Sequence, residues 1–521
     1  MEQSNKSPRA ARFNLELRGD RDMKEKLHEK IKTAKIVIQK LSAKNIQNFE
    51  VLDHALDKFL GSVNSVDIEA KPQSFVQLDR EKCMSEKIFM TSKTSIERCF
   101  EIGQQHGYFC KKSLEIIREK QLGHATLCEA KCADGHMYRW TSSSYIAGTS
   151  NYLVNQRIAF GYQTSGLLPS QYERFVEAAN MGSLSFHKRN LFSQDFEKCI
   201  NLEYNKCIES ARFEEMAFSS IESDTQQPIT ILTDARHGWR KNTHDSSVVA
   251  IGEITHKVLA CEHITKNDNP IPQKHELIGC KRIAESLDKD DIEVGVWVHD
   301  CNTTIDKYVT QLQDVTNQNE TWHGIKNLKK EISKVVSGAK TNEGKTWHRQ
   351  LCDKVLPIAT HAQYSMRNCG GDAQRLRDQL DNIVEHYQGN HEQCPSTSRC
   401  KTDPNYEPGH VIITDKKAVT LLKQAIQRSI IYKRPRNFCL AKDTYYVESF
   451  NNAILKFLDK RIAFSSREYG IRSKLAVLHW NENVDKEHTS EYRTKNSRKI
   501  SKTLKNTTHN YRLKLWNSFI S

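Results

Sequence analysis

The sequence is poor in glycine and proline and has no long apolar run. Of its 521 residues only 22 are glycine and 11 are proline, which excludes collagen-like and low-complexity chains. No stretch approaches the roughly 20 apolar residues that cross a bilayer. Residues 1–20 are polar and charged, without the apolar segment of a signal peptide. We therefore expect a soluble intracellular chain that does not contact a membrane.

The composition is that of a folded chain with a basic surface. Hydrophobic residues make up 37%, enough for roughly two to four domains of ordinary size. The net charge of +14 favours a polyanionic partner such as nucleic acid, although many basic proteins bind none. The 15 cysteines are an odd number in a chain without a secretory signal, so we expect reduced thiols and a metal site rather than disulfides.

The first 225 residues have a largely helical pattern. Apolar residues at three- and four-residue spacing from about 20 to 60 predict a helical arm within residues 1–70, which suits oligomerisation. Residues 71–225 follow as a small mixed and helical domain with a possible DNA-binding role. Within it the helical pattern of residues 152–192 is broken at Gly166 and Pro169, which indicates a helix-turn-helix arrangement. That geometry serves DNA readers and many other helical domains alike.

Two groups of histidine and cysteine have spacings compatible with zinc. His124, Cys128, Cys132 and His136 recur every fourth residue and offer four nitrogen and sulfur ligands. The alternative is a buried hairpin with two free thiols, because residues 137–142 look like a short strand containing a buried Trp140. Farther along, His391, Cys394 and Cys400 could hold zinc with one more ligand, or could be surface thiols beside a loop histidine.

From residue 226 the pattern becomes α/β. Three strand-like runs, a helix and a fourth strand-like run occupy residues 226–325, and the fourth strand can lie parallel beside the first. Residues 326–436 read as a helical insertion, and residues 437–484 return to the α/β core with a helix that carries Glu448. The end, 485–521, is rich in lysine and arginine and is expected to be a flexible basic tail.

Three acidic residues stand where such a sheet would bring them together. Asp234 and Asp300 each end an apolar strand-like run, and Glu448 lies beside the apolar stripe of a later helix. Converging carboxylates stay charged most easily by sharing two Mg²⁺ or Mn²⁺ ions, and such a pair of ions supports phosphoryl transfer. Each acid taken alone could instead simply end a strand or face water.

Four segments in order resemble a known family. They are TDARHGWRKNTHDSS around Asp234, ELIGCKRIAESL with VWVHDCNTTIDKY around Asp300, ETWHGIKNLKK around His323, and YYVESFNNAILKFLDKRIAF with LAVLHWNENV around Glu448. The region 123–484 resembles the DDE-type transposases of cut-and-paste DNA transposons, most nearly the Kolobok superfamily, whose catalytic core is ribonuclease-H-like.

The resemblance implies specific site residues and partners. Asp234, Asp300 and Glu448 would bind two Mg²⁺ or Mn²⁺ ions, His323 would line the site or cap a helix, and Arg236 would contact a phosphate or lie on the surface. Asp245 is a fallback for the first carboxylate. The resemblance further implies a nuclear, metal-dependent nuclease and strand-transfer enzyme, or a domesticated descendant, that acts on transposon ends and target DNA as a homo-oligomer.

Basic residues flank the last acid and are candidates for phosphate contacts. They are Lys433, Arg434, Arg436, Lys460 and Arg461, and contacts of this kind would position DNA without reading its sequence. The main alternative function is a non-catalytic DNA-binding protein that retains the transposase fold.

Overall fold

The computed structural model describes residues 80–221, 227–238, 243–493, 500–505 and 507–521. The chain divides into two compact units, Met1–Glu86 and Lys87–Ser521. Of the first unit the described residues are 80–86, which contain helix α4 (Arg80–Ser85). The helical arm expected within residues 1–70 therefore lies outside the described residues.

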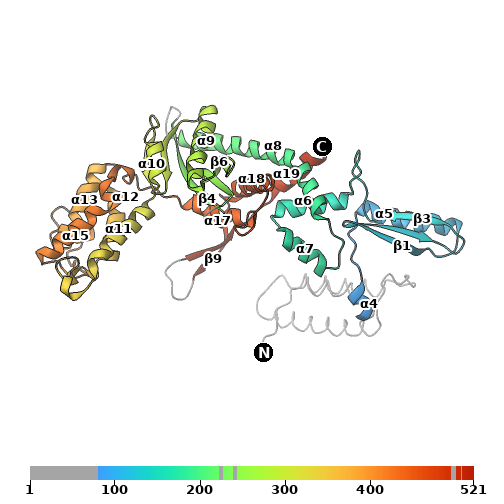
Figure 1. Cartoon of the computed structure of the whole chain (residues 1–521), viewed down its shortest axis with the longest axis horizontal. Coiled ribbons are helices and arrows are strands. Elements are labelled where there is room, and N and C mark those ends of the chain that lie inside the picture. Colours follow the sequence, from blue (N-terminus) through green and yellow to red (C-terminus); the bar gives the residue numbers. More distant parts are fainter. Residues whose placement is uncertain (1–79, 222–226, 239–242, 494–499, 506) are drawn as a thin grey trace, which may run out of the picture. The chain divides into compact units, whose positions relative to one another are not determined.

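The second unit begins with a helix and a small antiparallel sheet (Figure 1). Helix α5 (Lys93–Phe109) precedes strands β1 (Glu115–Leu122), β2 (Ala125–Lys131) and β3 (Met137–Thr141), which pair in the order β1-β2-β3. Strand β3 confirms the strand predicted at residues 137–142. Trp140 is half-buried, and its indole donates a hydrogen bond to the Ser95 carbonyl over 2.6 Å.

Three helices follow at the breaks that the sequence predicts. They are α6 (Leu153–Ser165), α7 (Pro169–Ala178) and α8 (Phe186–Ser219). Gly166 ends α6 in the left-handed region at φ 76°, which favours glycine, and Pro169 is the first residue of α7, where a missing backbone N–H has no consequence.

The centre of the unit is a mixed five-stranded sheet. Its strands are β4 (Ile229–His237), β5 (Asp245–Gly252), β6 (Val258–Thr265), β7 (Val294–His299) and β8 (Thr316–Asn319), in the spatial order β6-β5-β4-β7-β8. Strands β4, β5 and β6 pair antiparallel, whereas β4, β7 and β8 pair parallel. The parallel pairing of β7 beside β4 confirms the predicted α/β unit. The crossover contains η1 (Pro272–Lys274) and α9 (His275–Lys289), and α10 (Thr303–Val309) connects β7 to β8.

Both faces of this sheet are covered, because alternate residues of each strand point to opposite sides. On one face Leu232 and Val298 pack in a core with residues of α6, α8, α17 and α18. On the other face Ile231 and Trp297 pack with α9 and α10. The near-continuous apolar character of the central strands follows from this double burial.

A helical insertion separates β8 from the end of the core and has its own hydrophobic centre. It contains α11 (Thr321–Val336), η2 (Lys340–Asn342), η3 (Arg349–Leu351), α12 (Val355–Asn368), α13 (Ala373–His386), α14 (Arg399–Thr402), α15 (Lys416–Arg428), α16 (Ile430–Lys433) and η4 (Pro435–Asn437). The chain then returns to the sheet with α17 (Tyr445–Ala453), η5 (Ile454–Lys456) and α18 (Ser466–Asn483). The fold class is thus α/β with helical regions, as predicted.

The C-terminal segment is not wholly the flexible tail expected from its charge. It forms strands β9 (His488–Arg493) and β10 (Ile500–Lys505) and helix α19 (Asn510–Ile520). Tyr511 and Leu515 of α19 are buried in the core that α8 shares. Their helical spacing forms an apolar stripe. The many basic residues around this stripe made the segment resemble a flexible tail. Among the described helices, none has both the length and the apolar character needed to cross a membrane.

Candidate active site

Two of the predicted acids lie on neighbouring parallel strands. Asp234 is in β4, and Asp300 immediately follows β7. The ladder pairs Leu232 with Val298, and continuing that register by two residues brings Asp300 beside Asp234. Because side chains alternate along a strand, both carboxylates share the side of the sheet on which Leu232 and Val298 pack.

Helix α17 brings the third acid to the same side. Val447 and Phe450 of this helix are buried in the core that contains Leu232 and Val298, which fixes the helix against that face. One turn after Glu448, Asn451 donates a hydrogen bond to Asp234 Oδ2 over 2.8 Å. Glu448 itself is exposed in the first turn of α17. The three acids therefore converge on one side of the sheet.

The electrostatics of Asp234 reflect this convergence. Burial raises the pKa of Asp234 to about 6, with further contributions from the Asp300 and Glu448 carboxylates. Hydrogen bonds from the Ala235 backbone N–H and from Asn451 oppose the rise in this pKa. Three carboxylates on one side of the sheet provide the all-oxygen donor set that Mg²⁺ or Mn²⁺ prefers.

A fourth carboxylate, Glu276, lies beside this cluster and was missed by the sequence analysis. It stands in the first turn of α9 and accepts a hydrogen bond from Asn302 Nδ2 over 2.7 Å. Burial raises the pKa of Glu276 to about 8, and the Asp300 and Asp234 carboxylates add to the rise. The available signal was an acid at the start of the helix that crosses from β6 to β7.

The structure places Asp245, the alternative to Asp234 as first acid, away from this cluster. Asp245 is the first residue of β5 and accepts hydrogen bonds from His263 and His244. Asp234 pairs with Val249, so Asp245 lies four residues farther along β5, about 13 Å at the usual rise per residue. Asp234 is the residue that lies beside Asp300.

Arg236 was predicted to contact a phosphate or to lie on the surface, and the structure shows neither. It is buried rather than exposed, and its guanidinium donates a hydrogen bond to the Leu458 carbonyl over 2.6 Å. Because its side chain points into the core that joins β4 to the segment after α17, it is not available to a phosphate. This corrects the predicted phosphate contact.

His323 stands in the first turn of α11, where its Nδ1 pairs with the buried Glu320 carboxylate. The ring of Trp322 lies edge-on to its imidazole at 4.9 Å between centroids. The His323 side chain thus bonds a neighbouring acid, and the start of α11 has no capping hydrogen bond from a side chain. Among the described residues, no hydrogen bond or ion pair joins His323 to Asp234, Asp300 or Glu448.

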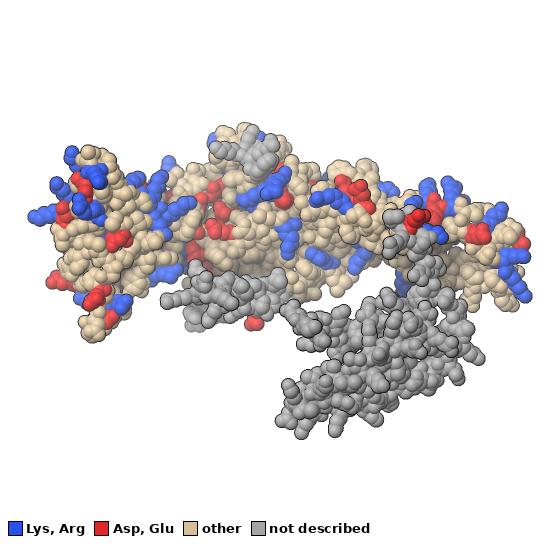
Figure 2. All heavy atoms as spheres, turned by 90° about the horizontal axis from the view of Figure 1, so that it is seen from below, with Lys and Arg blue, Asp and Glu red and all other residues tan. Residues whose placement is uncertain are grey.

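The predicted basic residues separate into two kinds. Lys433, Arg436, Lys460 and Arg461 are exposed, and Figure 2 shows lysines and arginines on the surface around a group of acidic side chains. The Arg434 side chain is also 45% exposed, but it makes an ion pair of 2.7 Å with the buried Asp306.

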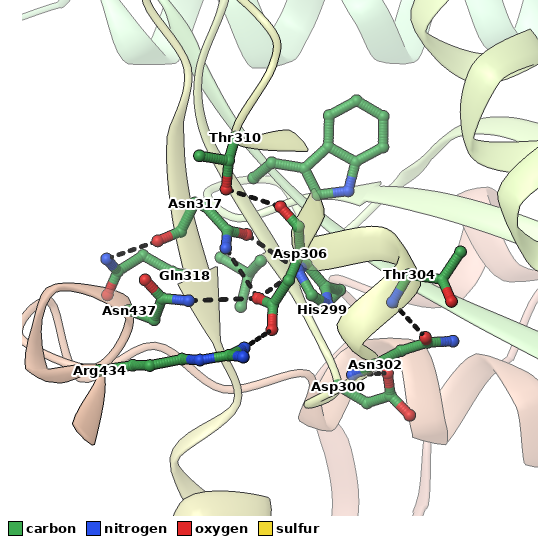
Figure 3. Close-up of polar contacts among 12 residues, drawn as sticks. His299, Asp300, Asn302, Thr304, Asp306, Thr310, Asn317, Gln318, Arg434 and Asn437 are labelled. Carbon is green, nitrogen blue, oxygen red and sulfur yellow. Dashed lines mark hydrogen bonds and ion pairs between the residues drawn. The ribbon is translucent and has the colours of Figure 1, made fainter. Parts of the chain in front are cut away.

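That ion pair belongs to a polar network at the base of the insertion (Figure 3). Asp306 also accepts hydrogen bonds from Asn317 at 2.8 Å and Asn437 at 3.1 Å, and Asn317 in turn pairs with His299 at the end of β7. Arg434 therefore fastens the insertion to α10, which follows Asp300, and Asn317 links this pair to His299 at the end of β7.

In the structure, both predicted zinc groups have a different set of ligands. Cys132 and His136 lie together, but His106 and Cys110 join them in place of His124 and Cys128. His124 is buried and pairs with the Tyr172 hydroxyl, and Cys128 lies in the middle of β2. His391, Cys394 and Cys400 do come together, and their fourth neighbour is His386.

Comparison with known proteins supports a transposase. Residues 267–400 match the family model of the Mutator-like transposases, a range that contains Glu276, Asp300 and the first part of the insertion. No curated protein matches the chain. A transposase of this kind implies phosphodiester chemistry on DNA.

Proposed function

We propose that the chain is a DDE-type transposase, most nearly of the Kolobok superfamily, that cuts and joins DNA in the nucleus. The observation that carries this proposal is the position of Asp234 and Asp300 on adjacent parallel strands, with α17 bringing Glu448 to the same face. The strand order and directions support a ribonuclease-H-like core. The match to Mutator-like transposases supports the reaction class but not this superfamily.

The donor set fits two divalent cations held by Asp234, Asp300 and Glu448. When bound, Mg²⁺ or Mn²⁺ would supply charge compensation and activate an attacking oxygen. Asn451 holds the Asp234 carboxylate in position through its 2.8 Å hydrogen bond. Because Glu448 is exposed, DNA can approach the acids from its side.

The reaction has two displacement steps at phosphorus. Water attacks a phosphodiester at the transposon end, so that a new P–O bond forms and the bond to the departing 3′ oxygen breaks. The freed 3′-hydroxyl then attacks a phosphodiester of target DNA in the same way. In each step the attacking oxygen loses one proton and the departing 3′ oxygen takes one up. Exposed Lys433, Arg436, Lys460 and Arg461 would bind the backbone, and a homo-oligomer would hold two ends together.

The test uses the full chain, Mg²⁺ or Mn²⁺, and labelled DNA from the ends of the element that encodes it. We expect wild-type protein to nick this DNA and Asp300→Asn to lose at least about 100-fold in rate while binding it equally well, because metal assistance is worth several kcal/mol. Glu285→Gln, an exposed acid on α9, is the matched control and should cut normally. If wild type and Asp300→Asn both bind and neither cuts, the chain is a non-catalytic DNA-binding protein instead.

A further inference from the structure

Two groups of side chains outside the carboxylate site combine two imidazoles with two thiols. The hairpin cluster is His106, Cys110, Cys132 and His136, and the insertion cluster is His386, His391, Cys394 and Cys400. In each cluster the four candidate ligand atoms lie within 4.8 Å of one another. We propose that each cluster binds one structural zinc ion, so that the chain carries two.

The hairpin cluster joins a helix end to a strand turn. His106 and Cys110 are one helical turn apart at the end of α5, where the Cys110 N–H bonds the His106 carbonyl. Cys132 and His136 flank the turn between β2 and β3, which the Cys132 N–H closes onto the His136 carbonyl. Two locally rigid pairs, far apart in sequence, thus present their side chains to one point.

The distances in the hairpin cluster lie within a few tenths of an ångström of those between ligands of a tetrahedral ion. With Zn–S near 2.3 Å and Zn–N near 2.0 to 2.1 Å, neighbouring ligand atoms should be about 3.3 to 3.8 Å apart. The Cys110 and Cys132 sulfurs are 4.0 Å apart, well beyond a disulfide bond, and Cys132 Sγ is 3.4 Å from His136 Nδ1.

A buried, unpartnered atom points to the same ligand. His106 is 3% exposed, and its Nε2 has no hydrogen-bond partner among the described residues. An imidazole nitrogen without a partner in the interior is unfavourable unless something binds it. The Cys110 sulfur also lies 3.3 Å from Asp134 Oδ2, an acid that could accept a hydrogen bond from the thiol when zinc is removed.

The insertion cluster closes a long segment with little regular structure. His386 ends α13, Cys400 lies in the four-residue α14, and His391 and Cys394 lie in the turn between them. The two histidine Nδ1 atoms are 3.1 Å apart, and they lie 3.4 and 3.8 Å from Cys394 Sγ. A hydrogen bond can explain each single pair, but the convergence of four potential ligand atoms is typical of a metal site.

The donor chemistry selects zinc and separates these sites from the carboxylates. Two thiolates and two imidazoles are borderline-soft ligands that form closed tetrahedral zinc sites, whereas Mg²⁺ takes oxygen. A groove of about 960 Å³ lined by His386, Cys394 and Cys400 lies at the insertion cluster. In the hairpin cluster, three of the four ligands are buried. The insertion zinc should therefore be removed first by a chelator.

The test measures zinc by mass spectrometry in the full chain after dialysis against excess Mg²⁺, without DNA. We expect two equivalents in wild type, one in Cys132→Ser, one in Cys394→Ser and none in the double variant. Cys128→Ser and Cys369→Ser are matched controls, buried cysteines outside both clusters, and should retain two.

Cobalt substitution of the wild-type chain checks the result without any variant that might fail to fold. Tetrahedral cobalt should give intense visible bands equal to two sites, and zinc should abolish them. Fewer than two equivalents, or loss of zinc from Cys128→Ser, would overturn the proposal for the affected cluster. Asp300→Asn should keep both zinc ions, so failure of the nuclease proposal would not change this result.

Discussion

The buried Glu276 gives the sharpest test of the carboxylate cluster, through the variant Glu276→Gln. The pKa of this residue rises from its ordinary 4.5 to about 8 because it is buried beside Asp300 and Asp234. Between these two values the folded chain holds a proton that the unfolded chain releases. The free energy of unfolding therefore falls as pH rises through that window.

The size of this effect follows from linkage. Each pH unit within the window removes about 1.4 kcal/mol, so wild type should lose about 4 kcal/mol from this group between pH 5 and pH 8. Glutamine keeps an oxygen that can accept the Asn302 hydrogen bond but carries no charge. Glu276→Gln should therefore become more stable than wild type by that amount as pH rises to 8.

The assay is urea unfolding followed by tryptophan fluorescence at pH 5, 6, 7 and 8, in magnesium-free buffer without chelator so that bound zinc is retained. Adding Mg²⁺ should shrink the difference at pH 8, because cations compensate the charge. Glu285→Gln, on the exposed face of the same helix, should track wild type at every pH. A Glu276→Gln chain whose advantage does not grow with pH would refute the proximity of Glu276 to the aspartates.

Three further variants test other contacts. Asn451→Ala should slow DNA cleavage at least about tenfold with unchanged DNA binding, since it removes a hydrogen bond of about 1.5 kcal/mol or more to a charged oxygen, and a cleavage time course measures this. Arg434→Ala should lower the free energy of unfolding by about 2 kcal/mol, because the Asp306 carboxylate, which is 6% exposed, loses its arginine and keeps the weaker hydrogen bonds from Asn317 and Asn437. The exposed Lys433→Ala should weaken only DNA binding, and urea unfolding and a filter-binding assay separate the two variants. Leu515→Ala should destabilise the chain by about 2 to 5 kcal/mol in urea, because this side chain of α19 is 0% exposed, and a change near zero would show that α19 does not pack on the core.

The local patterns of the sequence predicted the strands and the order of the acids well. Apolar runs ending in Asp234 and Asp300 indicate strands, and the parallel β4–β7 pairing confirms the predicted unit. Helical periodicity likewise predicted the insertion and the helix of Glu448. These features are readable because each depends on residues that are close together in the chain.

Features that depend on distant residues could not be read in the same way. Two of the partners of Cys132 in the hairpin cluster, His106 and Cys110, come from the end of α5, more than twenty residues earlier, so regular local spacing selected His124 and Cys128 instead. The inward orientation of Arg236 depends on a carbonyl at Leu458. The amino-acid type of such residues indicates chemistry, but only the fold decides which partner they meet.

The base of the helical insertion is closed by direct contacts between its two ends. The Gln318 side chain donates to the Arg436 carbonyl over 2.7 Å and accepts from the Leu440 N–H over 3.1 Å, and the Thr321 N–H bonds the Lys442 carbonyl. Because entry and exit are tied together, the insertion is a side branch whose length can change without altering the separation of Asp300 and Glu448. Related chains could therefore gain, lose or exchange this branch during evolution while the spacing of their acids stays the same.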